Sequence, residues 1–207
     1  MEDVLAVYKR PYDPRRPVVC LDESSRQLLA DTRAPQAVAP GRAPRQDYEY
    51  ERCGTRNLFM VFEPLAGWRT VPVTERRTKQ DWAHLIKDLL EGRYAQVEKV
   101  VLVQDNLNTH TPASLYETFG PAEARRLTEK LEWHYTPKHG SWLNVAECEF
   151  SALTRALPDR LAGQRALKSA VGAWENERNN ASVRVDWRFS TADARIKLKH
   201  LYPAIEL

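Results

Sequence analysis

The 207-residue sequence predicts a mixed α/β fold, in which a sheet of antiparallel and parallel strands carries helices on its faces. Two observations predict this class. Apolar, β-rich segments dominate residues 17–73, and from residue 78 onward segments of helical periodicity alternate with short apolar runs. The resulting order is β-β-β-α-β-α-β-α-α. It indicates three antiparallel strands followed by strand–helix alternation.

The first third of the chain supplies the antiparallel strands. Residues 17–30 (PVVCLDESSRQLLA) form a compact β-run. Residues 32–47 contain three prolines and a glycine, and we expect a mobile surface loop there, with Arg33, Arg42 and Arg45 on it. Two more β-rich segments, NLFMVFEPL and WRTVPV, lie within residues 48–73 and are separated by a hairpin turn at Ala66-Gly67.

The rest of the chain alternates between helices and strands. Residues 78–93 place five apolar side chains at helical spacing, with Thr78 as the N-cap. Residues 99–104 (KVVLVQ) are nearly all apolar, which is typical of a strand covered on both faces. The remaining predicted segments are one or two helices over 112–131, broken near Gly120-Pro121, a strand over 131–136, and helices over 142–161 and 167–179.

Composition excludes several protein classes. The hydrophobic fraction of 43% is too high for a disordered chain, and no apolar run approaches a membrane span. The N-terminus is acidic and lacks the apolar core of a signal peptide. Cys20, Cys53 and Cys148 are odd in number and contain no CxxC motif, so we expect a reducing compartment, with neither a disulfide framework nor a zinc site. The net charge of +3 permits nucleic-acid binding without arguing for it.

Three carboxylates lie where a metal site built on a sheet needs them. Asp22 is inside an apolar strand, Asp105 ends another, and Glu147 begins a helix. A charged side chain in an apolar strand costs free energy unless a partner compensates it, which suggests a shared cation. Mg²⁺ prefers oxygen ligands, and two such ions roughly 3.5–4 Å apart can hold the attacking and leaving oxygens of a phosphodiester.

Each of these residues has a plainer interpretation. An aspartate at a strand end is usually a turn former or a helix cap. Alternation places Glu23 on the opposite face from Asp22, so only one of the two can face the site. Glu147 and Glu149 lie roughly 160° apart on their helix, and periodicity does not choose between them. A polar row shared with Asn144 and Ser151 slightly favours Glu147.

The same residues lie in blocks that resemble a known family. The blocks LDESS, VLVQDNLNTHTPASLYETFGPAEARRL, LEWHYTPKHGSWLNVAECEFSAL and DWRFSTADARIKLKHLYP look like the catalytic region of bacterial insertion-sequence transposases of the insertion sequence 630 family, related to the mariner elements. The resemblance implies a ribonuclease H-like fold with a five-stranded mixed sheet flanked by helices. It also implies a DDE triad of catalytic, metal-binding acids at Asp22, Asp105 and Glu147. The last position follows from SWLN-x-x-E, which resembles the LNPIE block of mariner-like relatives.

The resemblance further implies metal-dependent DNA cleavage and strand transfer in transposition. Two Mg²⁺ ions, with Mn²⁺ as a substitute, are the implied cofactors. The implied partners are double-stranded DNA at the element ends and the target, and a second copy of the chain, in the bacterial cytoplasm at the nucleoid. Family members usually carry an N-terminal helix-turn-helix region. Nothing similar precedes Asp22, so we expect an arm or linker stub over residues 1–16 and a catalytic domain over 17–207, without that region.

Two other functions compete with this one. The first is a truncated, non-cutting transposase product that binds DNA, an upstream helix-turn-helix product or full-length transposase as a regulator. The second is a stand-alone ribonuclease H-like nuclease, against which the SWLNVAE block argues. For DNA binding, the candidates from loops near the acids and from the proline-rich loop are Asn106, His110, Lys138, His139, Arg42 and Arg45. Their plainer roles are local hydrogen bonds, caps and solvated charges.

Overall fold

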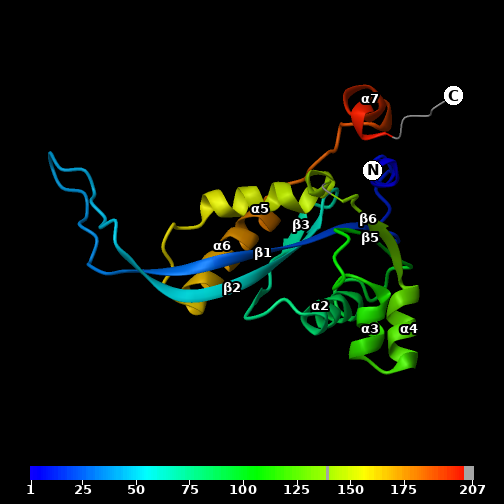
Figure 1. Ribbon diagram of the computed structural model, residues 1–207, viewed down its shortest axis with the longest axis horizontal. Helices are drawn as coiled ribbons and strands as arrows, with labels where there is room; N and C mark the ends of the chain where they lie inside the picture. Colours follow the sequence, from blue (N-terminus) through cyan, green and yellow to red (C-terminus); the bar gives the residue numbers. More distant parts are fainter. Residues whose placement is uncertain (139, 203–207) are drawn as a thin grey trace.

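The computed structural model describes residues 1–138 and 140–202 and contains one mixed sheet (Figure 1). The strand order is β3-β2-β1-β5-β6, and β4 pairs with β2 outside this path. β1 pairs antiparallel with β2 and parallel with β5, and β5 pairs parallel with β6. The strands are β1 (Val18–Asp31), β2 (Tyr50–Glu63), β3 (Trp68–Thr70), β4 (Val73–Thr74), β5 (Val100–Gln104) and β6 (Leu131–Tyr135). The predicted α/β class is confirmed.

The sheet has six strands in the described part of the chain, where five were expected. The difference arises in the segment WRTVPV, which forms two short strands, β3 and β4, on the same neighbour β2. Pro72 lies between them and has no N–H to donate, so a continuous ladder cannot pass through it. Its carbonyl oxygen still accepts a hydrogen bond of 3.1 Å from the backbone N–H of Phe59.

Helices cover both faces of the sheet. Thr78 caps α2 in a capping box with Asp81, as the sequence predicts for the start of that helix. Proline begins both α3 and α4, which explains the break expected near Gly120-Pro121. The α-helices are α1 (Glu2–Tyr8), α2 (Lys79–Glu91), α3 (Pro112–Thr118), α4 (Pro121–Glu129), α5 (Val145–Ala156), α6 (Gln164–Asn180) and α7 (Thr191–Lys197), with 3-10 turns η1 (Ser141–Leu143) and η2 (Lys199–Leu201).

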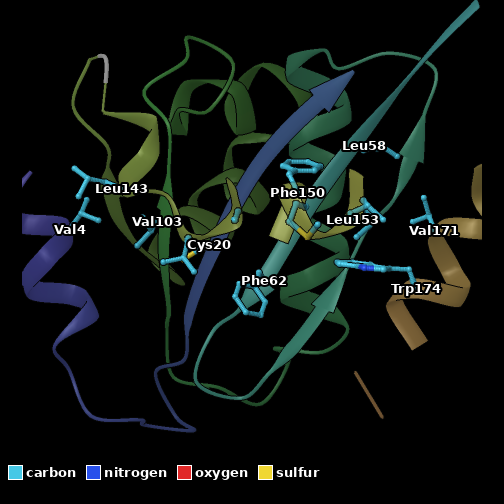
Figure 2. Close-up of a cluster of buried hydrophobic side chains, with 14 of the residues drawn as sticks. Val4, Cys20, Leu58, Phe62, Val103, Leu143, Phe150, Leu153, Val171 and Trp174 are labelled. Atoms are coloured by element: carbon cyan, nitrogen blue, oxygen red, sulfur yellow. The ribbon is translucent and has the colours of Figure 1, made fainter. Parts of the chain in front are cut away.

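The N-terminal segment differs from the expected arm or linker stub. Residues 2–8 form α1, and its Val4, Leu5 and Val7 are buried in the main hydrophobic cluster. Figure 2 shows Val4 within this cluster. Apolar residues on one face of a two-turn helix are enough to dock it once the sheet provides a surface. Two turns are too short for periodicity alone to reveal the helix.

Two hydrophobic clusters lie on opposite faces of the sheet. Alternation along β1 sends Cys20 to the cluster that α1, α5 and α6 cover, and Leu21 to the cluster that α2, α3 and α4 cover. β5 is buried at every position and contributes to both clusters, which explains its continuous apolar sequence. Among the residues described, no helix is both long and apolar enough to cross a membrane.

The strands β1 and β2 continue beyond the sheet as a two-stranded arm, which projects from the body of the molecule (Figure 1). The expected loop over 32–47 forms the tip of this arm. Two isolated bridges, Gln36–Arg45 and Ala39–Arg42, continue the pairing, and Gly41 turns the chain at φ +72°. Where this tip begins, the guanidinium of Arg160 donates hydrogen bonds to Asp31 Oδ1 and to the backbone carbonyl oxygen of Glu49.

Candidate active site

The two aspartates of the expected triad come from neighbouring parallel strands. Cys20 of β1 pairs in register with Val103 of β5. Asp22 and Asp105 each lie two residues further along, and Asp105 is the first residue after β5. Since side chains alternate along a strand, both aspartates project from the sheet face that α5 covers. Two neighbouring parallel strands thus bring together two carboxylates that are 83 positions apart in the sequence.

The third acid enters from the start of α5. Asn144 is the N-cap of this helix, and its side-chain oxygen accepts a hydrogen bond of 3.2 Å from the backbone N–H of Ala146. The amide nitrogen of the same side chain donates a 2.8 Å hydrogen bond to the carbonyl oxygen of Leu21. This hydrogen bond joins the start of α5 to the residue before Asp22. Glu147 lies in the first turn of α5 and is exposed.

The electrostatics of Asp22 report on all three acids. Its side chain is buried, and burial raises its pKa. The negative charges of Glu147 and Asp105 raise it further, and the resulting pKa is about 7. A backbone hydrogen bond of 2.8 Å from Glu23 N–H to Asp22 Oδ1 opposes this rise. The three carboxylates are therefore close enough to repel one another, and added positive charge would relieve that repulsion.

The residue types fit a divalent cation, because clustered carboxylate oxygens are the ligands that Mg²⁺ and Mn²⁺ take. The side chains do not enclose an ion, however. Among residues 1–138 and 140–202, no three His, Cys, Asp or Glu side chains lie close enough together to hold a metal. Asp22 and Asp105 instead accept hydrogen bonds from protein groups. Binding a cation requires the carboxylates to converge from the positions they occupy here.

His110 lies behind Asp105 and is fully buried. Its Nδ1 is 2.5 Å from Asp105 Oδ1, and its Nε2 is 3.0 Å from Glu23 Oε1, without the alignment of a full hydrogen bond. Burial lowers the pKa of the ring, but the two carboxylates outweigh it and raise the pKa to about 9. The expectation that His110 contacts DNA directly does not fit this position, because the ring has no exposed surface.

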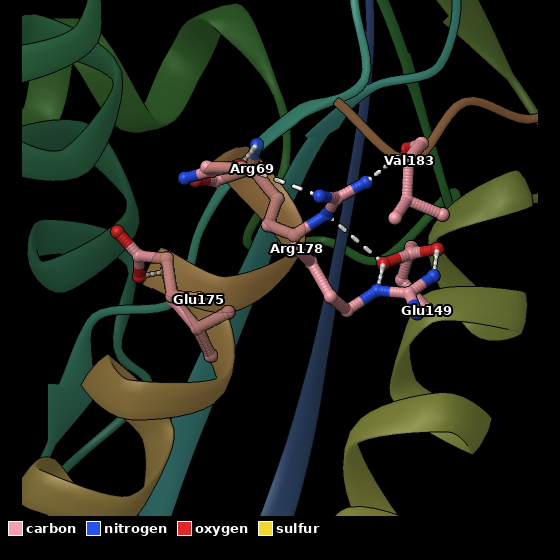
Figure 3. A network of polar contacts seen from close by, with 7 residues as sticks. Arg69, Glu149, Glu175, Arg178 and Val183 are labelled. Atoms are coloured by element: carbon pink, nitrogen blue, oxygen red, sulfur yellow. Dashed lines mark hydrogen bonds and ion pairs between the residues drawn. The ribbon is translucent and has the colours of Figure 1, made fainter. Parts of the chain in front are cut away.

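Glu149 has a different environment from Glu147. It is buried, and its carboxylate contacts Arg69 Nε at 3.0 Å and the guanidinium of Arg178 at 2.8 and 3.0 Å (Figure 3). Arg69 comes from β3 and Arg178 from α6, so this network joins three elements. The carboxylate of Glu149 is thus buried in an ion-pair network, and Glu147 is the exposed carboxylate of the two.

An open cavity of about 440 Å³ lies beside Asp105. Asp105 lines it together with two of the residues expected to bind DNA, Asn106 and Lys138, both exposed. The other lining residues are Leu107, Thr136, Pro137 and Ser141. His139, also expected to bind DNA, lies outside the described residues.

Arg42 and Arg45 are not part of this cavity. They lie at the tip of the β1–β2 arm and are exposed. The tip of the arm begins after Asp31, nine residues and about 30 Å along β1 from Asp22. These arginines are therefore remote from Asp22 along β1.

Sequence reasoning missed two features of this site. It assigned Asn144 to a polar row lining a cleft, whereas the side chain is fully buried and joins α5 to β1. An Asn directly before an apolar helical stretch is an N-cap signal that could have indicated this. It also set Glu23 aside as facing away from the site. Glu23 does lie on the other face, but His110 connects it with Asp105.

Solved structures share this fold. The chain is similar to the Mos1 mariner transposase in a paired end complex with Mn, with a TM-score of 0.56, 18% identity, and coverage of 87% of this chain and 55% of that chain. The catalytic domain of the Mos1 transposase alone gives a TM-score of 0.51, 15% identity, and coverage of 87% and 86%. The chain thus spans about half the length of the transposase in the paired end complex. The likeness confirms the expected ribonuclease H-like fold.

Sequence comparison gives the family. No curated protein sequence matches the chain. The family model described as DDE superfamily endonuclease matches residues 17–168, which include Asp22, Asp105 and Glu147. Because this match extends over well more than half of its 207 residues, the chain belongs to the DDE superfamily of endonucleases.

Proposed function

We propose that this chain is the catalytic domain of an insertion-sequence transposase of the insertion sequence 630 family, which cuts DNA strands and joins them to a target. The observation that carries the proposal is the convergence of three elements on one place. Two parallel strands in register deliver Asp22 and Asp105, and the capped start of α5 delivers Glu147. Family membership supports the endonuclease part of this proposal, since three such acids are what the family name describes.

Asp22, Asp105 and Glu147 are the proposed ligands for divalent cations, Mg²⁺ with Mn²⁺ as a substitute, and two ions in number. Bound cations would neutralise charge on the phosphodiester and lower the pKa of a nucleophilic water. Solved Mos1 complexes that contain Mn or Mg support this choice of ion.

The protein positions the reacting groups. In the first step water attacks a phosphodiester at the element end, breaks its bond to the 3′-oxygen and frees a 3′-hydroxyl. In the second that hydroxyl attacks a phosphodiester of the target, forms a new phosphodiester and displaces the 3′-hydroxyl of the target strand. Both are in-line displacements, for which positioning and charge neutralisation supply most of the catalysis. Lys138 and Asn106, beside Asp105 in the cavity, are the proposed contacts to the DNA backbone.

The proposed partners are the DNA of the element ends, the target DNA and a second copy of the chain. Solved structures of Mos1 as a paired end complex with a transposon end and as a strand transfer complex support the DNA partners. A helix-turn-helix product or full-length transposase is a further proposed partner. The proposed location is the bacterial cytoplasm, at the nucleoid.

The test is cleavage of an end-labelled duplex that carries the element end, with Mg²⁺, with Mn²⁺ and with excess chelator. We expect nicking with either ion and none in chelator, while circular dichroism shows the same folded protein in all three samples. Cleavage that persists in chelator would contradict the metal-dependent mechanism. Duplex binding without cleavage in either ion would instead support the regulator, a product that occupies DNA without cutting it.

A further inference from the structure

The buried ring of His110 links two strands through their carboxylates. Nδ1 contacts Asp105 after β5, and Nε2 contacts Glu23 of β1. His110 lies two residues before α3, so its contact with Asp105 closes a six-residue loop. Each ring nitrogen of His110 therefore contacts a carboxylate, Asp105 at Nδ1 and Glu23 at Nε2.

The position of this ring is fixed by its surroundings. The indole of Trp82 stacks on it, with 5.8 Å between ring centroids and 29° between planes. The backbone carbonyl of His110 accepts hydrogen bonds from Gln104 Nε2 at 2.9 Å and from the Tyr135 hydroxyl at 3.0 Å. Gln104 is held in turn by the indole N–H of Trp82 at 3.2 Å. The stack thus holds the plane of the ring and the two hydrogen bonds hold its backbone, so that Nδ1 is directed at Asp105.

Asp105 depends on this donor for its orientation. It lies just beyond β5, where ladder hydrogen bonds no longer fix the chain. Among the residues that the structure describes, the contact with His110 is the one hydrogen bond that the Asp105 side chain makes. That contact occupies Oδ1 and leaves Oδ2 available to a cation.

Glu23 shows that the arrangement costs stability. Its side chain is 3% exposed, and its Oε2 has no hydrogen-bond partner within the described part of the chain. A buried carboxylate that is incompletely paired is destabilising, so folding alone does not account for it. Carboxylates and histidines behind metal ligands hold those ligands in place, and their loss typically weakens metal binding about 10- to 100-fold.

We propose that His110 is a positioning residue, held by Glu23 from the opposite face of the sheet, that fixes the Asp105 carboxylate for metal binding. This inference rests on the proposed function, because it takes Asp105 as a metal ligand. His110 itself contacts neither DNA nor the metal. Glu23 acts one step further away, through the ring.

The chain contains a matched control. His134 is another buried histidine between two acids, with Nδ1 2.7 Å from Asp3 and Nε2 3.0 Å from Glu132. It lies on β6 and contacts none of the three proposed ligands. Changing either histidine removes a similar set of contacts, so a purely structural role predicts similar effects of both changes.

The experiment measures Mn²⁺ binding to the whole chain by electron paramagnetic resonance, without DNA or turnover. We expect H110N to weaken Mn²⁺ binding about 10- to 100-fold, E23Q to weaken it by about three- to tenfold, and H134N to leave it within about twofold. Thermal unfolding identifies folded variants, and E23Q, which keeps the ring, remains a test if H110N does not fold. Unchanged binding in folded H110N, or in E23Q where H110N does not fold, overturns the inference.

The variant D105N distinguishes a failure of the positioning inference from a failure of the proposed metal site. If the wild-type chain binds Mn²⁺ and D105N does not, Asp105 is a ligand, and the histidine variants then test positioning alone. If D105N binds as tightly as the wild type, the metal site itself is wrong, and both proposals fail together.

Discussion

The amide nitrogen of Asn144 donates a 2.8 Å hydrogen bond to the carbonyl oxygen of Leu21 and thereby joins the start of α5 to strand β1. The residues that follow these two partners include two of the three acids proposed to bind metal. Asp22 follows Leu21 directly, and Glu147 lies three positions after Asn144. A buried side chain thus sets the distance between two carboxylates that come from separate elements.

Replacing Asn144 should therefore affect both stability and cleavage. N144A removes the helix cap and leaves the Leu21 carbonyl without its partner, and we expect a loss of about 1–3 kcal/mol. N144D keeps the acceptor for the cap but not the donor to Leu21. We expect both variants to cut more slowly at a temperature where urea titration shows them folded. Wild-type cleavage rates in folded N144A and N144D would show that this contact does not position Glu147.

Glu149 should matter for stability and not for chemistry. E149Q removes one partner from a buried network with two arginines, and breaking such a pair costs about 3–5 kcal/mol. The exposed Glu129, paired with Arg125 on α4, provides the control, and E129Q should cost less than about 1 kcal/mol. The measurements are urea unfolding and cleavage per folded molecule. If folded E149Q does not cleave DNA, Glu149 and not Glu147 is the catalytic acid of this helix.

Acid should remove the contribution of Glu132, which anchors the N-terminal segment to β6. Burial raises its pKa, but hydrogen bonds from His134 and Arg10 and the charge of Arg16 outweigh this and lower the pKa to about 2. A depressed pKa stabilises the fold above the ordinary value of 4.5, and the stabilisation disappears as pH falls toward 2. The difference in unfolding free energy between wild type and E132Q should therefore shrink from pH 6 to pH 3. A difference that is independent of pH would contradict this assignment.

The arm arginines should bind DNA without reading its sequence. Arg42 and Arg45 can offer phosphate contacts, which position DNA but carry no base information. We expect R42A and R45A to weaken binding equally for element ends and random duplex, each reducing the log–log salt slope by about 1. Fluorescence anisotropy at several salt concentrations measures this, with R125A on α4 as the control. A loss confined to the element ends would show direct readout by the arm.

Local signals in the sequence predicted much of the fold. The apolar run that became β5 is buried on both faces, and Thr78 caps α2 as its position before an apolar helical pattern indicates. These features depend on neighbouring residues, which periodicity and capping rules describe well. The split of the third β-segment at Pro72 depends on pairing with β2, and no local signal fixes that pairing.

The site was predictable only in part. Composition and spacing selected Asp22 and Asp105, because charged residues in apolar strands are costly. The environment of Glu149 follows from Arg69 and Arg178, which are distant in sequence and meet it only in the folded chain. Such long-range ion pairs leave no periodic pattern in the sequence, so the sequence alone could not show that Glu149 is buried in an ion-pair network.

The most direct test of the account is to remove each proposed ligand while keeping its shape. D22N, D105N and E147Q should each lower Mn²⁺-dependent cleavage of an end-labelled duplex at least about a hundredfold, because each deletes one anionic ligand of a shared site. D88N, at an exposed position on α2, should cut like the wild type. Far-ultraviolet circular dichroism verifies that all four variants are folded. Loss of cleavage in the three variants alone is the predicted result, whereas wild-type cleavage by any folded one of them would contradict the shared site.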